Sequence, residues 1–272
     1  MLPSKFRVVR ANSMEWGYTL SGLLVGFIVG LTGVGGGSLM TPLLILGFGI
    51  SPATAVGTDL LYASLTKAGG VWVHGRRGTV DWKLVRRLAT GSLPAALLTV
   101  LGLNALGVEN QVFSGLITST LGVALILTAL ALFFRYQLAH LGKSRFSSLA
   151  AWRDRHIVTA TIATGAILGV LVTITSVGAG ALGMVALIVL YPRAPTINLV
   201  GSDIAHAVPL TLIAGIGHAY LGTVDFGLLG SLLLGSLPGI YLGSHIGGRI
   251  PERILRPALA AILVIIGGRL IW

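Results

Sequence analysis

Thr32-Gly33-Val34-Gly35-Gly36-Gly37-Ser38 interrupts an apolar run that extends from about residue 17 to residue 49. A glycine cluster at membrane depth leaves backbone N–H and C=O groups unpaired, and hydrocarbon tolerates such groups only where they face protein or a watery cavity. A second stretch, Thr175-Ser176-Val177-Gly178-Ala179-Gly180, interrupts a second apolar run, residues 156–190, at the equivalent place. The sequence therefore predicts two broken membrane segments that face each other across a common site.

The composition is that of a polytopic membrane protein. Of 272 residues, 54% are hydrophobic and 10% are charged, with a mean hydropathy of +0.90, values that exclude a soluble domain of this size. The net charge of +11 comes from Lys and Arg in short segments between apolar runs, which is the positive-inside pattern. Nucleic acid is therefore not an expected partner. The chain has no Cys, which excludes disulfides and thiolate metal sites.

Six further stretches are long enough to span a bilayer, since a helical span needs roughly 20 apolar residues. They lie near residues 53–73, 88–108, 111–134, 197–218, 227–247 and 254–272. Each glycine-broken run has about 33 residues, too many for one simple helix and slightly few for two full ones. Each run forms either a single kinked span or a hairpin of two helices.

Three short motifs occur twice at a constant distance of 144 residues, and the glycine breaks recur at a distance of 143. The pairs are Gly57-Thr58-Asp59-Leu60 with Gly201-Ser202-Asp203-Ile204, Gly78-Thr79-Val80-Asp81 with Gly222-Thr223-Val224-Asp225, and Gly91-Ser92-Leu93-Pro94 with Gly235-Ser236-Leu237-Pro238. The chain is predicted to be a duplicated unit. We expect an N-terminal tail at 1–16, a first transmembrane repeat at 17–134, a basic linker at 135–156 and a second repeat at 157–272.

Loop charges favour inverted repeats. Basic residues surround the first Gly-Thr-Val-Asp loop, whereas the matching loop, residues 220–227, has no Lys or Arg. One loop later the basic residues lie in the second copy, at Arg249, Arg253 and Arg256. If Lys and Arg mark the cytoplasm, equivalent loops lie on opposite sides and each repeat crosses an odd number of times. This predicts an all-α protein with about five membrane helices per repeat. The alternative, eight spans in parallel repeats with both ends inside, is favoured by the basic N-terminal tail.

The motifs together resemble a known family. The Gly-x-Gly-Gly-Gly break, Pro42 after it, Ala55-Val56-Gly57-Thr58-Asp59, the Gly-x-Val-Asp loop and the repetition of the pattern in the second half are similar to those of the TauE/SafE sulfite-exporter family of bacterial membrane transporters. The resemblance covers almost the whole chain. It implies a multi-pass protein of the cell (inner) membrane that transports small sulfur-containing anions, although a family fixes fold better than substrate. The second copy departs from the glycine pattern, with Ser176 where the first has Gly33.

The two breaks are the predicted substrate-binding residues. A helix that begins inside the membrane after Gly37 or Gly180 presents free N–H groups and the positive end of its dipole, and small residues let an anion approach the backbone. The alternative is that the glycines only permit close helix packing. The predicted set is Thr32, Gly33, Gly35, Gly36, Gly37, Ser38, Thr175, Ser176, Gly178 and Gly180.

Asp59 and Asp203 are predicted coupling residues. A charged side chain at the centre of a span costs roughly 2.5–3.5 kcal/mol by insertion scales and so usually serves a site or a charge pair. We expect the two carboxylates to bind a coupling proton or sodium ion, with Thr58 and Ser202 beside them as hydroxyl donors. Alternatively, the carboxylates accept backbone hydrogen bonds from the broken helices.

Two further side chains are candidate site residues, whereas two other aspartates are predicted to have a structural role. Lys67 is a predicted partner of the substrate anion, or it extends to the cytoplasmic boundary. His206, one turn after Asp203, is a predicted coupling residue, or it bonds a neighbouring helix. Asp81 and Asp225 are predicted helix N-caps.

The predicted function is alternating-access transport of a small anion, such as sulfite, a sulfonate or a related organic anion, coupled to protons or Na⁺. A passive channel is the main alternative, since glycine-lined backbone also forms selectivity filters. An intramembrane enzyme is not expected, because the sequence has no HExxH, GxSxG or cysteine nucleophile. The expected partners are the anion, membrane lipid and a coupling ion, with no cofactor, and a homodimer is one possible assembly.

Overall fold

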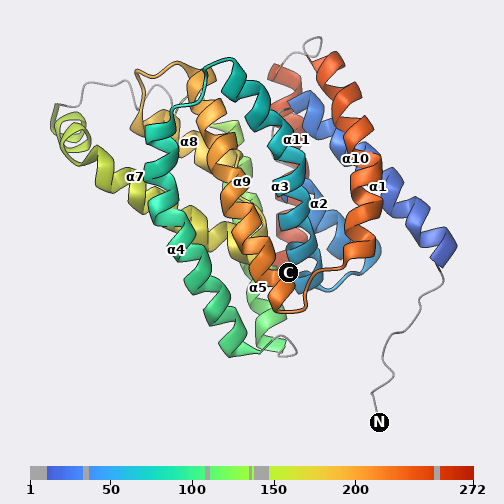
Figure 1. The fold of residues 1–272 in the computed structure, drawn as a ribbon. Helices are drawn as coiled ribbons and strands as arrows, with labels where there is room; N and C mark the ends of the chain where they lie inside the picture. The colour runs from blue at the N-terminus through green and yellow to red at the C-terminus, as the bar shows by residue number, and fades with distance from the viewer. Residues whose placement is uncertain (1–10, 33–36, 108–110, 135–136, 138–146, 248–251) are drawn as a thin grey trace.

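The computed structural model describes residues 11–32, 37–107, 111–134, 137, 147–247 and 252–272, and within these ranges it contains helices and no strands (Figure 1). The helices are α1 (Ala11–Thr32), α2 (Gly37–Pro42), the π-helix η1 (Leu43–Gly47), α3 (Pro52–Arg76), α4 (Trp82–Leu106), α5 (Gln111–Phe133), α7 (Ser147–Thr175), α8 (Ala181–Leu190), α9 (Thr196–Tyr220), α10 (Phe226–Gly247) and α11 (Glu252–Ile271). The predicted all-α class is confirmed for these residues. All six predicted spans correspond to helices, namely α3, α4, α5, α9, α10 and α11.

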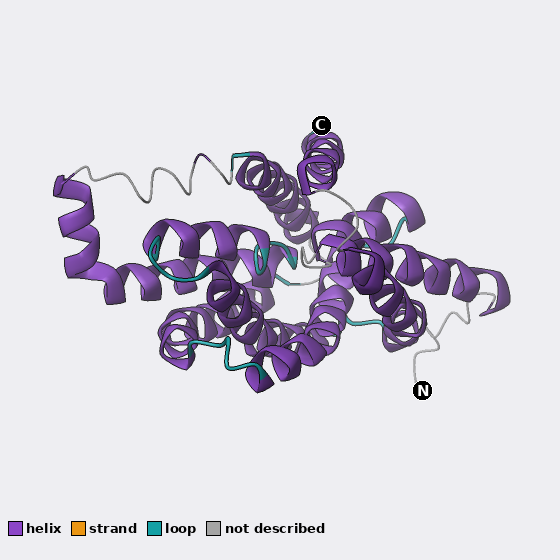
Figure 2. Ribbon diagram, turned by 90° about the horizontal axis from the view of Figure 1, so that it is seen from above, coloured by secondary structure: helices purple, strands orange, loops and turns teal. Residues whose placement is uncertain are grey.

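Each glycine-broken run forms two helical segments. In the first run α1 ends at Thr32 and α2 begins at Gly37, continuing directly into η1. In the second run α7 ends at Thr175 and α8 begins at Ala181. The second run is thus described throughout as two helices joined by a break, whereas residues 33–36 of the first run lie outside the described residues. Seen from above, the part of α7 before the kink at His156 turns away from the other helices (Figure 2).

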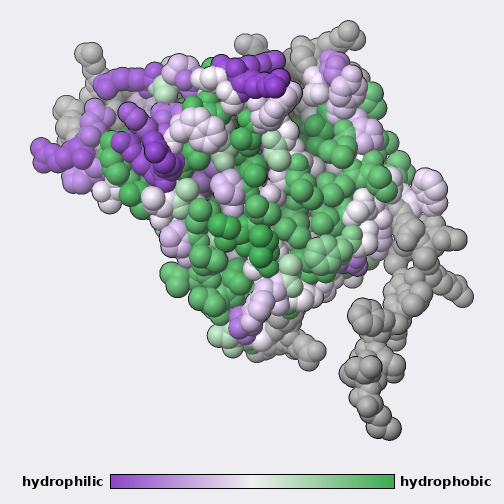
Figure 3. All heavy atoms as spheres, in the orientation of Figure 1, coloured by the Kyte–Doolittle hydropathy of each residue, from purple (hydrophilic) through white to green (hydrophobic). Residues whose placement is uncertain are grey.

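The helices have the length and surface of a membrane protein. Five of those described, in α4, α5, α7, α9 and α10, are long and apolar enough to cross a bilayer. Figure 3 shows apolar side chains over the body of the molecule, with hydrophilic side chains gathered at the end where α3 connects to α4 and α8 to α9. Exposed Arg76, Arg77, Lys83 and Arg193 belong to these connections.

Local sequence explains where several helices begin. Ser51 caps α3, with Pro52 at the first helical position, and its hydroxyl accepts from the backbone N–H of Thr54 at 3.3 Å. Asp81 Oδ1 accepts from the backbone of the first turn of α4 at 2.9 and 3.1 Å. Asp225 Oδ1 does the same at α10, at 2.9 Å. The prediction that both aspartates are N-caps is confirmed.

Glycines let α1 pack against α10, and α7 against α4. A Cβ atom on Gly22 would lie 2.3 Å from Leu232 O, and one on Gly165 would lie 2.2 Å from Leu88 O. The two contacts are equivalent in the duplicated sequence, since the glycines are 143 residues apart and the leucines 144. Each backbone approach is possible only because the glycine has no side chain.

Helices α3 and α9 pack side by side at the centre and run antiparallel (Figure 1). Leu61 packs against Gly215, and Gly70 packs against Ile204. Higher numbers in α3 thus meet lower numbers in α9. The two helices carry equivalent motifs 144 residues apart, so equivalent segments point in opposite directions.

Two reciprocal hydrogen bonds join each central helix to the opposite half of the chain. The backbone N–H of Asp225 donates to Thr58 Oγ1 at 3.0 Å. The backbone N–H of Asp81 donates to Ser202 Oγ at 2.8 Å. The two bonds are equivalent, because the donors Asp81 and Asp225 are 144 residues apart and so are the acceptors Thr58 and Ser202. Thr58 and Ser202 therefore anchor the loops before α10 and α4.

Candidate functional site

Buried polar side chains gather where α3, α9, α4 and the break between α7 and α8 meet. Asp59 and His206 are fully buried and Asp203 is 3% exposed. Asp59 and Asp203 each lie five residues before Ser64 and Val208, where antiparallel α3 and α9 are in contact, so the two acids approach this contact from opposite ends. Among the described residues, the buried side-chain atoms without a hydrogen-bond partner are Asp59 Oδ1, Tyr62 OH, Thr128 Oγ1, Ser176 Oγ, Asp203 Oδ1 and His206 Nδ1. An unpaired buried polar atom costs about 1–3 kcal/mol. All of these atoms except Thr128 Oγ1 belong to residues that interact with Asp59 or Lys67, so their concentration calls for an explanation.

The break between α7 and α8 is an irregular turn held in conformations that favour glycine. Gly178 and Gly180 have φ of +124° and +125°, and Ser176 has φ of +59°, an unusual value for a residue with a side chain. Thr175 Oγ1 accepts from the backbone N–H of Val177 at 3.1 Å and stabilises the turn. Gly180 precedes α8 without a side-chain cap, so the first N–H groups of α8 lie at this turn.

Lys67 connects α3 to this turn. Its Nζ donates a hydrogen bond to Ala179 O at 3.0 Å, and its charge interacts with both Asp59 and Asp203. The side chain thus extends to the break rather than towards the helix end at His74. The equivalent residue in α9 is the neutral Thr211, whose hydroxyl donates to Ala207 O of its own helix at 2.9 Å. Among the described residues, the Lys or Arg side chain at this site comes from the first half of the chain alone.

Asp59 is contacted from both broken runs. The Thr41 hydroxyl of α2 donates to Asp59 Oδ2. The Ser176 hydroxyl of the second break lies close to the same carboxyl group without completing a well-formed hydrogen bond. Thr41 was not among the predicted site residues, because an isolated threonine in an apolar run gives no sequence signal.

Asp203 and His206 face different neighbours. Asp203 Oδ1 lies against α8, where a Cβ atom on Gly183 would be only 2.4 Å away. His206 Nε2 is 2.7 Å from Ser92 Oγ of α4. Ser92 is a second residue that the site prediction missed, although its duplicated Gly-Ser-Leu-Pro motif was a signal that could have identified it.

The cluster contacts described above do not include the other predicted site residues. Gly33, Gly35 and Gly36 are outside the described residues, and nothing is described of the side chains at Thr32 and Gly37. Ser38 is buried in α2. Thr58 and Ser202 are adjacent to the acids in sequence, but their hydroxyls accept the loop N–H groups described above.

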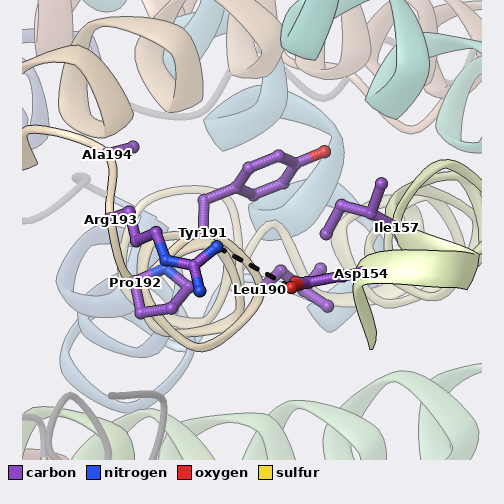
Figure 4. Close-up of a pocket in the computed structure, with 7 residues that line it drawn as sticks. All are labelled: Asp154, Ile157, Leu190, Tyr191, Pro192, Arg193 and Ala194. Carbon is purple, nitrogen blue, oxygen red and sulfur yellow. Dashed lines mark ion pairs between the residues drawn. The ribbon is translucent and has the colours of Figure 1, made fainter. Parts of the chain in front are cut away.

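A surface pocket lies between α7, near its kink at His156, and the connection from α8 to α9 (Figure 4). It is lined by Asp154, Ile157, Leu190, Tyr191, Pro192, Arg193 and Ala194. Asp154 and Arg193 approach across it at 3.7 Å, with side chains 51% and 85% exposed, and an exposed ion pair of this kind contributes little energy. The pocket contains none of the predicted site residues.

The sequence relationships agree with this geometry. A family model described as "Sulfite exporter TauE/SafE" matches residues 18–270. The chain belongs to the sulfite exporter TauE/SafE family. It is similar to the probable membrane transporter protein YjnA of Bacillus subtilis (strain 168), at 42% identity over 253 residues that cover 93% of this chain and 98% of YjnA. It is also similar to YdhB of the same organism, another probable membrane transporter protein, at 27% identity over 89% of this chain and 96% of YdhB. No solved structure matches the chain.

Membership of the TauE/SafE family establishes the general class of this protein. The family is one of membrane transporters, and the relatives carry transporter names. Together with the long apolar helices, this makes the chain a multi-pass transporter of the cell membrane and not an enzyme. The predicted family resemblance and membrane location are confirmed.

Proposed function

We propose that this TauE/SafE protein is a secondary transporter that carries a small anion, such as sulfite, a sulfonate or a related organic anion, by alternating access with proton or sodium coupling. The observation that carries the proposal is the central cluster of buried, unpaired polar atoms beside the broken helix α7–α8. Such a cluster within a membrane bundle is the expected form of a substrate and ion pathway.

The anion-binding groups of this proposal are Lys67, Ser176 and the backbone at Gly178 and Gly180. The ammonium group of Lys67 supplies the positive charge, and the start of α8 supplies backbone N–H groups and the positive end of a helix dipole. Lys67 Nζ is already held at the break by Ala179 O. Charge and backbone donors therefore act on the same small volume. The first break, with Thr32, Gly33, Gly35, Gly36, Gly37 and Ser38, is proposed as the other half of the site.

Asp59, Asp203 and His206 are the proposed coupling residues. All three are buried within hydrogen-bonding or electrostatic reach of the central cluster. A carboxyl group in such a place changes its charge when it binds or releases a cation. Binding of the coupling ion then alters the field at Lys67, where the anion is held.

Two inverted repeats, 17–134 and 157–272, are the proposed framework for alternating access. The antiparallel packing of α3 against α9 supports inversion, because these helices are equivalent in the duplicated sequence. Ser64 Oγ donates to Val208 O at 3.4 Å, and these two residues are themselves 144 residues apart, which is expected on a pseudo-two-fold axis. Eight parallel spans would make equivalent helices run in the same direction.

An asymmetry between the halves supports alternation. His218 at the end of α9 is buried, and its Nε2 is 2.9 Å from Thr173 O in α7. The equivalent histidine in α3, His74, is half-buried. Both histidines contact the adjacent loop threonine through Nδ1, His74 with Thr79 Oγ1 at 2.8 Å and His218 with Thr223 Oγ1 at 2.9 Å, but His74 has no described contact that matches the one from His218 Nε2 to Thr173 O. The end of α9 is thus closed against the broken helix of its own half. In an inverted-repeat transporter, exchange of the two arrangements would open one side and close the other.

The test is sulfite flux into proteoliposomes under imposed proton or sodium gradients. We expect accumulation against the sulfite gradient, driven by one of the two ions. Lys67→Gln should lower the uptake rate about tenfold or more, since a hydrogen bond to a charged group contributes about 1.5–3 kcal/mol. Lys83→Gln, at an exposed lysine in the first turn of α4, is the matched control and should transport normally.

Two outcomes would overturn parts of this proposal. Passive equilibration that ignores both ion gradients would indicate an anion channel. Absence of flux for sulfite and for sulfonates, with a correctly inserted protein, would remove the substrate assignment.

A further inference from the structure

Asp59 and Asp203 occupy equivalent positions but have different hydrogen-bond environments. Asp59 Oδ2 accepts a hydrogen bond from Thr41. No described residue donates a hydrogen bond to the Asp203 carboxyl group, and its Oδ1 is buried against Gly183. A carboxylate taken out of water without donors is far less favourable than the neutral acid in the same place. The two acids are therefore suited to different roles.

The difference arises from the helices that follow the two breaks, α2 and α8. By the 143-residue offset of the two breaks, the residue equivalent to Thr41 is Met184. All of α8, with the sequence ALGMVALIVL, lacks hydroxyl, amide and charged side chains. Helix α8 therefore has no side chain that can donate to Asp203, whereas α2 supplies one to Asp59.

The charged and titratable side chains near Asp203 come from two helices. Helix α3 contributes Lys67, which interacts with both acids, and Asp59. Helix α9 contributes His206, which is bonded to Ser92 of α4. Helix α4 carries its charged residues before Thr90 and α7 carries its titratable residues before Ile157, towards the start of each helix, and α8 has none.

These groups set the charge of the site. Two carboxyl groups share one ammonium group, so an anion that joins two ionised carboxylates would add a negative charge without a partner. Like charges in a poorly hydrated site repel strongly. Neutralising one of the carboxyl groups with a proton removes this repulsion.

We infer that Asp203 is the proton-binding member of the pair, and that the anion occupies the site together with a proton held on the Asp203 carboxyl group. This deepens the proposed function and rests on it. The proton comes from the solvent on the side of entry and leaves to the solvent on the side of exit. Asp59, held by Thr41, keeps its charge beside Lys67 and is a positioning residue.

The first test needs no substrate. Infrared spectroscopy of the protein in lipid, recorded over a pH series, detects the C=O stretching band of a buried protonated carboxyl group. We expect Asp203→Asn to remove this band and Asp59→Asn, the matched variant at the equivalent position, to retain it. If Asp203→Asn does not fold, Asp203→Glu replaces it and should shift the band. The inference would be overturned if the wild type lacked the band or if Asp59→Asn lost it. It would also be overturned if Asp203→Asn retained the band or if Asp203→Glu left its frequency unchanged.

The second test measures proton uptake when methanesulfonate binds. This probe stays ionised at neutral pH, so any proton taken up must reside on the protein. With a pH indicator in weak buffer, we expect proton uptake by the wild type. Asp203→Asn should bind methanesulfonate without proton uptake, because the amide is neutral like the protonated acid. Unchanged uptake in Asp203→Asn would contradict the inference.

The two tests separate this inference from the proposed function. Absence of flux for every sulfur anion, with the infrared result as expected, would count against the transport proposal alone. If the wild type shows normal proton-driven flux but the carboxyl band survives in Asp203→Asn, the assignment of the proton to Asp203 is wrong and the transport proposal stands.

Discussion

Lys67 in α3 and Ala179 in the break between α7 and α8 are 112 residues apart in the chain, and the lysine Nζ donates to the alanine carbonyl oxygen at 3.0 Å. This hydrogen bond joins the first half of the chain to the broken helix of the second. It also keeps an ammonium group among buried acids, where an unpaired charge would be costly. The contact defines the candidate site more sharply than any single sequence motif does.

The orientation of the repeats can be tested by cysteine labelling. Trp82 and Phe226 begin α4 and α10, are 55% and 66% exposed, and occupy equivalent positions 144 residues apart. In intact cells, a membrane-impermeant maleimide should label only one of the variants Trp82→Cys and Phe226→Cys if the repeats are inverted. The wild type has no Cys and serves as the unlabelled control. Labelling of both variants from the same side would favour parallel repeats.

Gly183→Ala tests the packing of Asp203 against α8. The new methyl group would lie 2.4 Å from Asp203 Oδ1, so the carboxyl group must move. We expect a loss of transport of about tenfold or more, the effect of about 1.4 kcal/mol in the transition state, measured as sulfite uptake into proteoliposomes. Gly230→Ala in α10, where a Cβ atom meets nothing within 4 Å, is the control. Equal transport in the two variants would show that the position of Asp203 does not matter.

Gly235→Ala tests the close contact of α10 with α1. A Cβ atom there would lie 1.8 Å from Thr19 O, which forces the two helices apart. Overpacking of this kind destabilises proteins by about 1–3 kcal/mol, and we expect a lower melting temperature in detergent. Gly102→Ala in α4, with open space around it, should leave the melting temperature unchanged or slightly raised. An unchanged melting temperature in Gly235→Ala would contradict the close approach.

Thr58→Ala and Ser202→Ala test the reciprocal loop anchors. Each removes the acceptor for a loop N–H group, of Asp225 or Asp81 respectively. Leaving such a donor unpaired costs about 1–3 kcal/mol, so both variants should unfold at lower temperature. If these hydroxyls also coordinated the coupling ion, the ion dependence of transport would change. We expect that dependence to be the same as in the wild type, measured as sulfite uptake at varied pH and Na⁺.

Some features of the candidate site were predictable from the sequence because they are local. An acid within an apolar span is expensive wherever the span lies, so Asp59 and Asp203 are evident candidates before any contact is known. The duplicated loop aspartates are recognisable as N-caps, since capping depends on neighbouring residues in the chain. Glycines Gly178 and Gly180 are likewise recognisable as a helix break.

Thr41 and Ser92 could not be identified in this way. Each is a small hydroxyl residue in an apolar helix, and such residues most often bond the backbone of their own helix. Their partners, Asp59 and His206, are 18 and 114 residues away. Only the packing of helices from different parts of the chain gives these hydroxyls their roles.

The sequence by itself determined that this protein is a helical membrane transporter of the TauE/SafE family with a duplicated, glycine-broken plan. The membrane class follows from apolar length, the duplicated plan from motif spacing and the helix breaks from the cost of unpaired backbone in hydrocarbon. The family and the transporter class rest on the resemblance of the motifs to those of known members. The tertiary structure alone decided that Lys67 reaches Ala179 and that Asp59 has a hydroxyl donor where Asp203 has none among the described residues. Those relationships depend on how α3 and α9 cross and on what α2 and α8 place beside them. Equivalent residues in a duplicated sequence therefore have different surroundings.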